Sequence, residues 1–178
     1  MRSASRSPFH DRHSGKTMTV ISMRVLNPDD WPLWRAMRLA ALSEAPYAFV
    51  STLEEWTGDG DTEKRWRDRL VSVPFNLIAE LDGQPVGMAS GSSPANEEIE
   101  LISMWVHPSA RGHAVGDALV EAIIAWAVEQ QVARVTLYVR KENIRAVALY
   151  ARNGFADVGS VSRPSDPFPE RKMTRELR

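Results

Sequence analysis

The most informative absence in this 178-residue chain is cysteine, of which there is none. A disulfide scaffold, a cysteine-ligated zinc site and a cysteine acyl-enzyme are therefore excluded. No apolar run approaches the ~20 residues of a membrane span, and no apolar segment typical of a secretory signal follows the early arginines. These absences lead us to expect a cytoplasmic protein without a membrane partner.

The chain also lacks an excess of charge of one sign. It has 22 Lys and Arg against 23 Asp and Glu, a formal net charge of -1. Such a balance gives no electrostatic reason to expect a nucleic-acid partner. Hydrophobic residues make up 43% and charged residues 25% of the chain, which is typical of a soluble globular protein. The length suits one domain, which we place at residues 18–178.

Residues 1–17 differ from the rest in composition. They are rich in Ser, Arg and His and show no apolar periodicity, so they offer little surface whose burial would offset the entropy of ordering. We predict a disordered leader or tag-like tail, with Met18 as a candidate native start. A basic arm that binds a partner is the alternative.

The remaining pattern predicts alternating strands and helices. Asp82-Gly83 lies between two β-like runs and predicts an antiparallel hairpin. Apolar residues between Trp31 and Leu42 recur near the 3.6-residue period of a helix. Strands are predicted at 21–26, 75–81, 84–91, 97–106, 134–139, 155–161 and 170–177, and helices at 30–43, 62–71, 117–130 and 144–153.

The segment 98–116 carries the first chemical signal. A strand runs into a short basic turn that contains glycine, and the turn runs into a helix. The free amides and positive dipole end of a helix N-terminus bind phosphate groups. Arg111 and His113 add donors, while Gly112 and Gly116 allow close approach of the backbone. We predict a pyrophosphate site, with a plain surface loop or an ATP site as alternatives.

The second signal begins at Asn143, which is expected to cap a helix. Tyr150 follows about two turns later on the same face of that helix. From position alone, Tyr150 is either a functional hydroxyl or a packed tyrosine. Gly154 is expected to end the helix.

Together the two segments resemble the GCN5-related N-acetyltransferase (GNAT) superfamily, in element order over 21–177 and most sharply over 98–155. The superfamily's pyrophosphate motif, Arg/Gln-x-x-Gly-x-Gly/Ala, falls on residues 111–116. Its second signature, Asn followed by Ala-x-x-Leu-Tyr and Gly-Phe, falls on residues 143–155. One position departs from the motif, because Ala114 stands where the first glycine is found. We expect a negative φ there, which alanine tolerates, although its methyl group would crowd the phosphates.

The resemblance implies an α/β (α+β) fold with a single mixed, mostly antiparallel sheet and helices on both faces. The strands at 97–106 and 134–139 are expected to splay apart and to hold the pantetheine arm of acetyl-CoA, the implied cosubstrate. No metal is implied. The cofactor-binding residues that the resemblance implies are the backbone of Met104, Trp105 and Val106, the turn residues Arg111, Gly112, His113, Ala114, Val115 and Gly116, and Asn143 with Ala146. Arg140, Lys141 and Arg145 are candidates for the 3′-phosphate, or else a solvated charge cluster.

The implied reaction is direct attack of an amine on the thioester. Tyr150 matches the tyrosine that protonates the departing thiolate in many relatives. Glu100 matches a position where some branches carry the general base, and Glu98 is the reserve candidate because it shares the parity of the strand. A solvent-facing strand glutamate is the alternative interpretation of Glu100. A backbone amide of the 97–106 strand would bind the oxyanion.

The acceptor is expected to be a primary amine of a small molecule or peptide. In this fold the cleft is built from residues 45–66, 97–100 and 162–170. The carboxylates of the first segment could form an acidic rim for a cationic amine, although we favour a solvated loop and helix N-terminus. Those carboxylates are Glu54, Glu55, Asp59, Asp61 and Glu63. Tyr47, Trp56, Trp66 and Phe168 could form an apolar wall or belong to the core.

Two alternatives to this activity are a CoA-binding module without turnover and an acyltransferase for a longer acyl-CoA. The resemblance also leaves a homodimer open.

Overall fold

The computed structural model describes residues 19–93, 97–163 and 166–178, so the predicted leader at 1–17 lies outside the described residues. The strands are β1 (Ile21–Val25), β2 (Phe75–Leu81), β3 (Gln84–Ser92), β4 (Glu98–Val106), β5 (Arg134–Arg140), β6 (Ala156–Arg163) and β7 (Asp166–Glu176). The α-helices are α1 (Trp31–Glu44), α2 (Glu63–Ser72), α3 (Val115–Glu129) and α4 (Ile144–Arg152). The predicted order of strands and helices is confirmed.

One predicted boundary is wrong by several residues, because β7 begins at Asp166 and not near Glu170. Its pairing with β5 starts only at Glu170, whereas its pairing with β6 starts at Asp166. The early part of β7 therefore has a single neighbouring strand. Pro169 is tolerated there, since a proline without an N–H group is disfavoured mainly inside a central ladder.

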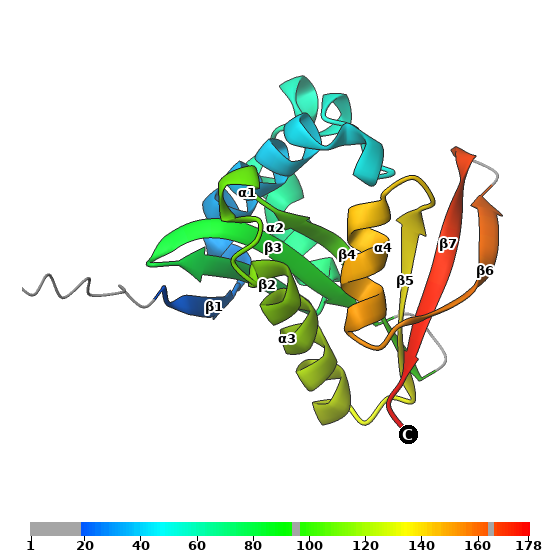
Figure 1. Ribbon diagram of the computed structural model, residues 1–178. Coiled ribbons are helices and arrows are strands. Elements are labelled where there is room, and N and C mark those ends of the chain that lie inside the picture. Colours follow the sequence, from blue (N-terminus) through cyan, green and yellow to red (C-terminus); the bar gives the residue numbers. More distant parts are fainter. Residues whose placement is uncertain (1–18, 94–96, 164–165) are drawn as a thin grey trace, which may run out of the picture.

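A single sheet of seven strands in the order β1-β2-β3-β4-β5-β7-β6 organises the molecule. All neighbours are antiparallel except β4 and β5. The parallel pairing of β4 with β5 ends at Glu100 opposite Thr136. Both strands continue beyond that point, to Val106 and Arg140. The two central strands therefore splay apart, as predicted, and a gap opens between them (Figure 1).

A β-bulge interrupts β4 just where the gap opens. Ile102 lies opposite Ser90 and Trp105 opposite Met88, so two residues of β4 face Ala89 alone. Ser103 takes up the irregularity with a φ of 55°. An inserted residue bends a strand and redirects the side chains and backbone groups beside it. The bulge thus turns part of the β4 backbone out of regular pairing with β3.

Helices cover both faces of the sheet (Figure 1). α3 and α4 pack on one face over a core that includes Leu119, Ile123 and Tyr150. α1 and α2 pack on the other face over a second core that includes Trp34 and Trp66. Trp105 of β4 belongs to the second core, and its neighbour Met104 packs against the first. β4 therefore presents side chains to both layers.

The link between α1 and α2 is built from three 3₁₀ turns, Pro46–Ala48, Glu54–Trp56 and Gly58–Gly60. Asp61 fastens its end, because its carboxylate accepts 2.7 Å and 2.8 Å hydrogen bonds from Arg35 and the Trp66 indole. These bonds, from Arg35 first and Trp66 second, lower the pKa of Asp61 to about 2. The link is thereby held over the end of the second core.

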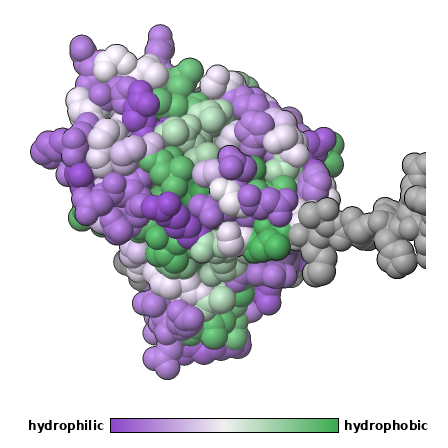
Figure 2. All heavy atoms as spheres, turned by 90° about the vertical axis from the view of Figure 1, so that its left-hand side faces the viewer, coloured by the Kyte–Doolittle hydropathy of each residue, from purple (hydrophilic) through white to green (hydrophobic). Residues whose placement is uncertain are grey.

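On the face drawn in Figure 2, apolar residues form an interrupted band between hydrophilic margins. Exposed valines such as Val20 and Val25 occur near β1, and single exposed apolar residues are ordinary on a protein surface. Among the described helices, none combines the length and the apolar character needed to cross a membrane.

Candidate active site

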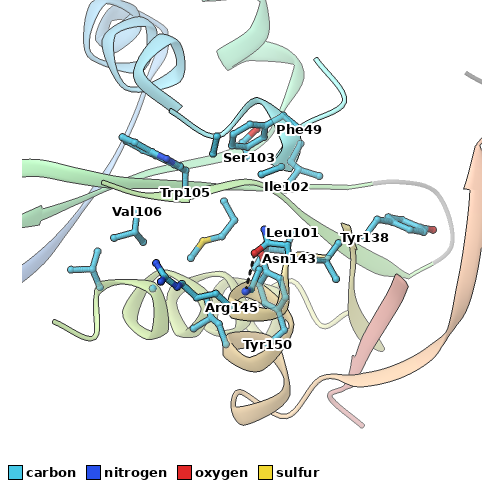
Figure 3. Close-up of a pocket in the computed structure, with 18 of the residues that line it drawn as sticks. Phe49, Leu101, Ile102, Ser103, Trp105, Val106, Tyr138, Asn143, Arg145 and Tyr150 are labelled. Carbon is cyan, nitrogen blue, oxygen red and sulfur yellow. Dashed lines mark hydrogen bonds between the residues drawn. The ribbon is translucent and has the colours of Figure 1, made fainter. Parts of the chain in front are cut away.

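A cavity of about 830 Å³ lies at the gap between β4 and β5. It reaches both faces of β4. Figure 3 shows Phe49, Ser103 and Trp105 on one side of this strand and Asn143, Arg145 and Tyr150 on the other. We call the side of α3 and α4 the donor side and the side of α1 and α2 the acceptor side.

The donor side contains the N-terminus of α3. The backbone N–H groups of Gly112, Ala114, Val115 and Gly116 line the cavity region and donate no hydrogen bond to any described residue. The amides of Arg111 and His113 instead donate to the preceding turn, at 3.3 Å and 3.4 Å. Four free donors at the start of a 15-residue helix fit a pyrophosphate well.

Ala114 corrects one sequence-based expectation. It is the N-cap of α3 and has a φ of 60°, in the left-handed region, and not the negative φ that we expected. A residue with a Cβ atom costs roughly 1–2 kcal/mol there relative to the right-handed conformation. The reason is position: Ala114 precedes the first helical residue and is not part of the first turn. A glycine in the motif would relieve this strain.

Gly116 is explained by packing as well as by ligand approach. A Cβ atom at this position would lie 3.2 Å from the Leu149 side chain of α4. The glycine therefore lets α3 and α4 pack closely. Arg152 strengthens the same contact, because it donates two 2.7 Å hydrogen bonds to Asp117.

Arg111 lines the cavity, but its side chain already has partners. Its guanidinium donates to the Val106 carbonyl at 3.1 Å and to the Glu44 carboxylate at 2.7 Å. Glu44 also accepts a 3.0 Å hydrogen bond from the Trp105 indole. Hydrogen bonds from Arg111, and then from Trp105, lower the pKa of Glu44. The side chain of Arg111 thus anchors the turn to α1. His113 is exposed and is not among the residues that line the cavity.

The second signature is arranged as its capping residues predict. The Asn143 side-chain oxygen accepts from the Ala146 amide at 3.2 Å, which confirms the N-cap. At the other end, Gly154 has a φ of 83°. The Phe155 amide donates to the Tyr150 carbonyl and the Gly154 amide to the Ala151 carbonyl, both at 3.1 Å. This is a Schellman arrangement, and it ends the helix.

The same arrangement positions Tyr150. Its ring meets the Phe155 ring edge-on with centroids 6.0 Å apart, which is the apolar contact that accompanies this kind of helix end. Tyr150 is only 6% exposed and lines the cavity, as Asn143 and Ala146 do. Burial raises the pKa of its hydroxyl, so Tyr150 stays protonated at neutral pH.

The two candidate bases differ in position. Glu100 lines the cavity, at the last paired position of β4 before the gap. Glu98 does not line it, and its carboxylate accepts a 3.4 Å hydrogen bond from the Thr136 hydroxyl. The side chains of alternate residues share a face of the strand, so both point to the acceptor side with Thr136. Geometry therefore favours Glu100.

The three candidates for binding the 3′-phosphate also differ in their position relative to the cavity. Arg145 lies in the cavity on the donor side (Figure 3). Arg140 donates to the Phe168 carbonyl at 3.1 Å, and Lys141 is exposed outside the cavity. Arg145 is thus the one of the three that is placed to meet a ligand in this cavity.

The acidic rim is not part of the cavity. None of Glu54, Glu55, Asp59, Asp61 and Glu63 lines it, and the plainer interpretation of a loop followed by a helix N-terminus agrees with the structure. Asp61 is paired with Arg35, Glu63 with Arg67, and Glu55 accepts from the Thr52 amide.

The four candidate wall aromatics have different places. Tyr47 and Trp56 line the cavity. Trp66 is a fully buried core residue, and its ring lies 4.5 Å from that of Trp56. Phe168 is exposed and stacks with Arg140, outside the cavity. Only two of the four can therefore contact an acceptor in this cavity.

The main cations of the acceptor side were not predicted from the sequence. Arg38 of α1 and Arg69 of α2 both line the cavity. Arginines inside amphipathic helices are usually solvated, so the sequence offered no strong reason to place these two in a cavity. A signal was present, because Arg38 follows Trp34 by one turn and shares the apolar face of α1.

Comparison with known proteins gives one family match. The model of the acetyltransferase (GNAT) family matches residues 34–155. A mycothiol acetyltransferase from Salinispora tropica is 30% identical over 142 residues, which cover 76% of this chain and 45% of that protein. This chain therefore spans less than half the length of that relative.

Solved structures share the fold. PaiA N-acetyltransferase from Thermoplasma acidophilum, in complex with coenzyme A, superposes with a TM-score of 0.69 at 17% identity, covering 89% of this chain and 99% of that one. A ribosomal-protein-alanine N-acetyltransferase from Brucella melitensis has a TM-score of 0.64 at 25% identity, covering 88% and 99%.

Proposed function

The chain belongs to the acetyltransferase (GNAT) family, and from this premise we propose that it moves the acetyl group of acetyl-CoA to a primary amine of a small molecule or peptide, by direct attack in a ternary complex. One observation carries the proposal. A single cavity joins the free amides of α3 to Tyr150 and Glu100 and continues to the acceptor side. Donor and acceptor can thus be held together.

On the donor side, the four free amides at the start of α3 would hold the pyrophosphate. The Asn143 side-chain oxygen is used by the helix cap, which leaves its amide nitrogen to reach the pantetheine arm. The backbone of Met104, Trp105 and Val106 follows the bulge along the gap and would pair with that arm as an added strand does. Arg145 would meet the 3′-phosphate.

Two proton transfers accompany the reaction. The amine nitrogen attacks the thioester carbonyl, a C–N bond forms and the C–S bond breaks. Glu100 would accept the proton that an alkylammonium group must lose, because such amines have a pKa near ~10. Tyr150 would give its hydroxyl proton to the departing sulfur, which it can do because burial keeps it protonated. A β4 backbone amide near the bulge would bind the oxyanion.

The proposal is tested by measuring thiol release from acetyl-CoA with a panel of primary amines. Initial-rate plots are expected to intersect, as they do when both substrates bind before any product leaves. Parallel lines, or an acetylated protein detected by mass spectrometry, would contradict direct attack. Saturable binding of acetyl-CoA with no thiol release for any amine would point to a binding module. Faster thiol release from a longer acyl-CoA than from acetyl-CoA would identify the longer acyl-CoA as the donor.

Binding of the donor has a separate test in thermal unfolding. A ligand present at about 100 times its Kd stabilises a protein by about 2.7 kcal/mol. We expect the melting temperature to rise with CoA and acetyl-CoA. A rise with ATP and none with CoA would assign the turn after β4 to a nucleotide.

A further inference from the structure

The acceptor side of the cavity contains a buried arginine that has no carboxylate partner among the described residues. Arg38 is 8% exposed and lines the cavity. Its Nη1 is buried without a hydrogen-bond partner, and within the described part of the chain no carboxylate pairs with its guanidinium. Its guanidinium lies over the Phe49 ring, with Cζ 4.6 Å from the ring centroid. Burying an unpaired charge is costly, so such a group is expected to serve a ligand.

A second cation stands beside it. Arg69 donates to the Asn76 side-chain oxygen at 3.0 Å and to the hydroxyls of Ser90 and Ser103, both at 3.3 Å. These partners are neutral. Burial lowers the pKa of Arg38 to about 10, and burial followed by repulsion from Arg38 lowers the pKa of Arg69 to about 10. Both residues remain charged at neutral pH, and each makes the other's charge less favourable.

A third donor on the same helix is also unpaired. The Trp34 indole is fully buried, lines the cavity, and its Nε1 has no hydrogen-bond partner among the described residues. Trp34 and Arg38 are one helical turn apart on α1 and so share a face. Trp34, Arg38 and Arg69 therefore gather N–H donors and positive charge at one part of the acceptor side. Glu100 and Glu170 also line the cavity, from β4 and β7, but among the described residues neither forms an ion pair with Arg38 or Arg69. The ligand group that supplies only acceptors, and so fits these three donors, is an oxyanion.

We propose that Trp34, Arg38 and Arg69 form a subsite for the carboxylate of the acceptor, which makes the acceptor an amino acid; the inference rests on the acetyl transfer proposed above. Arg38 is the principal contact. Arginine presents a planar fork of donors that matches a carboxylate. Phe49 covers a face of the guanidinium, and the N–H groups lie in its plane, so they remain directed at an in-plane acceptor.

The subsite is close to the reacting centre, which limits the length of the acceptor. Arg69 donates to Ser103, the bulge residue of β4. The next residue is Met104, where the strand expected to hold pantetheine begins. From this contact we infer that a carboxylate bound by the arginines would lie a few bonds from an amine that attacks the thioester. This spacing matches an α-amino acid or a short homologue.

The number of uncommitted donors favours a carboxylate over a phosphate. Arg69 already uses its guanidinium on three neutral side chains, and Arg38 alone is unpaired. A single guanidinium with free N–H groups offers one planar fork, which the two oxygens of a carboxylate fill. Tyr47 and Trp56 add apolar surface to the same cavity, so an acceptor with an apolar side chain fits best.

The first test compares matched acceptors with the wild-type protein. L-phenylalanine, its amide, phenethylamine and the aminophosphonic acid analogue are each supplied with acetyl-CoA, and thiol release is measured. We expect kcat/KM for phenylalanine to exceed that for the amide and for phenethylamine by about 100-fold or more, because the latter leave the buried donors unpaired. Equal or faster turnover of the amide would overturn the inference and leave the acetyl transfer intact.

The other outcomes are also decisive. Turnover of the phosphonate with none of the carboxylate would overturn the carboxylate assignment in favour of a phosphate group. If none of the four acceptors and none of the amines in the wider panel gives thiol release, the proposed acetyl transfer is overturned, and the inference with it.

The second test uses Arg38→Gln, with Arg35→Gln as a matched control. Arg35 is on the same helix but outside the cavity, paired with Asp61. Arg38→Gln should raise KM for phenylalanine by about 10- to 100-fold while KM for acetyl-CoA changes by less than about twofold. It should also shift the ratio of phenylalanine to phenethylamine turnover toward phenethylamine, which a merely structural role would not do. Arg35→Gln should leave that ratio unchanged. Equal loss for both acceptors in Arg38→Gln would overturn the subsite.

Discussion

Arg111 and Glu44 join the turn before α3 to the end of α1 through a 2.7 Å ion pair. The two residues are 67 positions apart. Glu44 simultaneously accepts from the indole of Trp105, a β4 residue at the gap. One carboxylate thus connects the element that would hold the pyrophosphate with the strand that would hold pantetheine and with the helix that carries Arg38. We infer that it sets the relative position of the donor and acceptor sides.

Replacing Glu44 by glutamine should weaken the use of acetyl-CoA without stopping the chemistry. Glutamine keeps an oxygen for Trp105 but loses the charge that holds Arg111. Because the pair is partly exposed, the expected rise in KM for acetyl-CoA is about 2- to 5-fold, with kcat nearly unchanged. Glu63→Gln, which removes an ion pair with Arg67 outside the cavity, is the control. Equal effects of the two variants would argue against a special role for Glu44.

The same pair predicts a pH dependence. Arg111, and then Trp105, lower the pKa of Glu44 below its ordinary value of 4.5. A lowered folded-state pKa means that the contribution of the pair is fully present above about pH 4.5 and is lost as pH falls below it. The difference in CoA affinity between wild type and Glu44→Gln should therefore be constant from pH 5 to 8 and shrink toward pH 3.5. Calorimetric titrations across this range measure it. A difference in CoA affinity that grows as the pH falls would have the opposite sign and would contradict the prediction.

Ala114→Gly should stabilise the protein. Ala114 has a φ of 60°, where a Cβ atom is unfavourable by roughly 1–2 kcal/mol. Glycine offsets part of that gain by making the unfolded chain more flexible, so we expect a net increase of about 0.5–1 kcal/mol in the free energy of unfolding. Ala118→Gly, inside α3, should instead destabilise by about 1 kcal/mol. Denaturant unfolding of both variants checks the contrast. Destabilisation by Ala114→Gly would mean that the left-handed conformation is not populated.

The parts that followed from sequence are those in which local rules decide the structure. Asn143 caps α4 and Gly154 ends it because few other residue types satisfy the free backbone groups at those places. The hairpin at Asp82-Gly83 is also local, with both residues at positive φ. The resemblance supplied the splay of β4 from β5, since local propensity does not determine which strands separate.

The parts that did not follow depend on tertiary contacts. The φ of Ala114 depends on where α3 begins, and a shift of one residue changed its expected sign. Arg38 is a helical arginine whose meaning appears only when Phe49 and Arg69 fold around it. Arg111 was assigned to the phosphates by its motif, although its side chain is held by Glu44, far away in sequence.

Glu100→Gln should reduce activity more at low pH than at high pH. A base is needed most while the acceptor amine is still protonated, and less as the amine loses its proton unaided. The test is kcat/KM from pH 6 to 10 for wild type, Glu100→Gln and Glu98→Gln. Glu98 lies outside the cavity, so its variant should have a pH profile like that of wild type. A uniform loss in Glu100→Gln at every pH would assign that residue to structure, and a selective loss in Glu98→Gln would move the base to Glu98.

Tyr150→Phe should lower kcat by about 10- to 1,000-fold with little change in CoA affinity, because it removes the proton donor for sulfur and keeps the ring. The ring contributes to the stability of the fold, because Tyr150 packs edge-on against Phe155 and is 6% exposed. The melting temperature of Tyr150→Phe should therefore stay near that of wild type. Tyr150→Ala should instead lower the free energy of unfolding by about 3–5 kcal/mol, because it leaves a cavity in the core. Tyr138→Phe removes the hydroxyl of another residue that lines the same cavity, from β5, and is the matched control, because in Figure 3 this hydroxyl points away from Asn143 and Tyr150. Because burial raises the pKa of Tyr150 above its ordinary value of 10.0, its proton should remain available through pH 10. An alkaline loss of wild-type activity below that pH must then come from another group. Full activity in Tyr150→Phe would remove this hydroxyl from the mechanism and leave Tyr150 a packing residue alone.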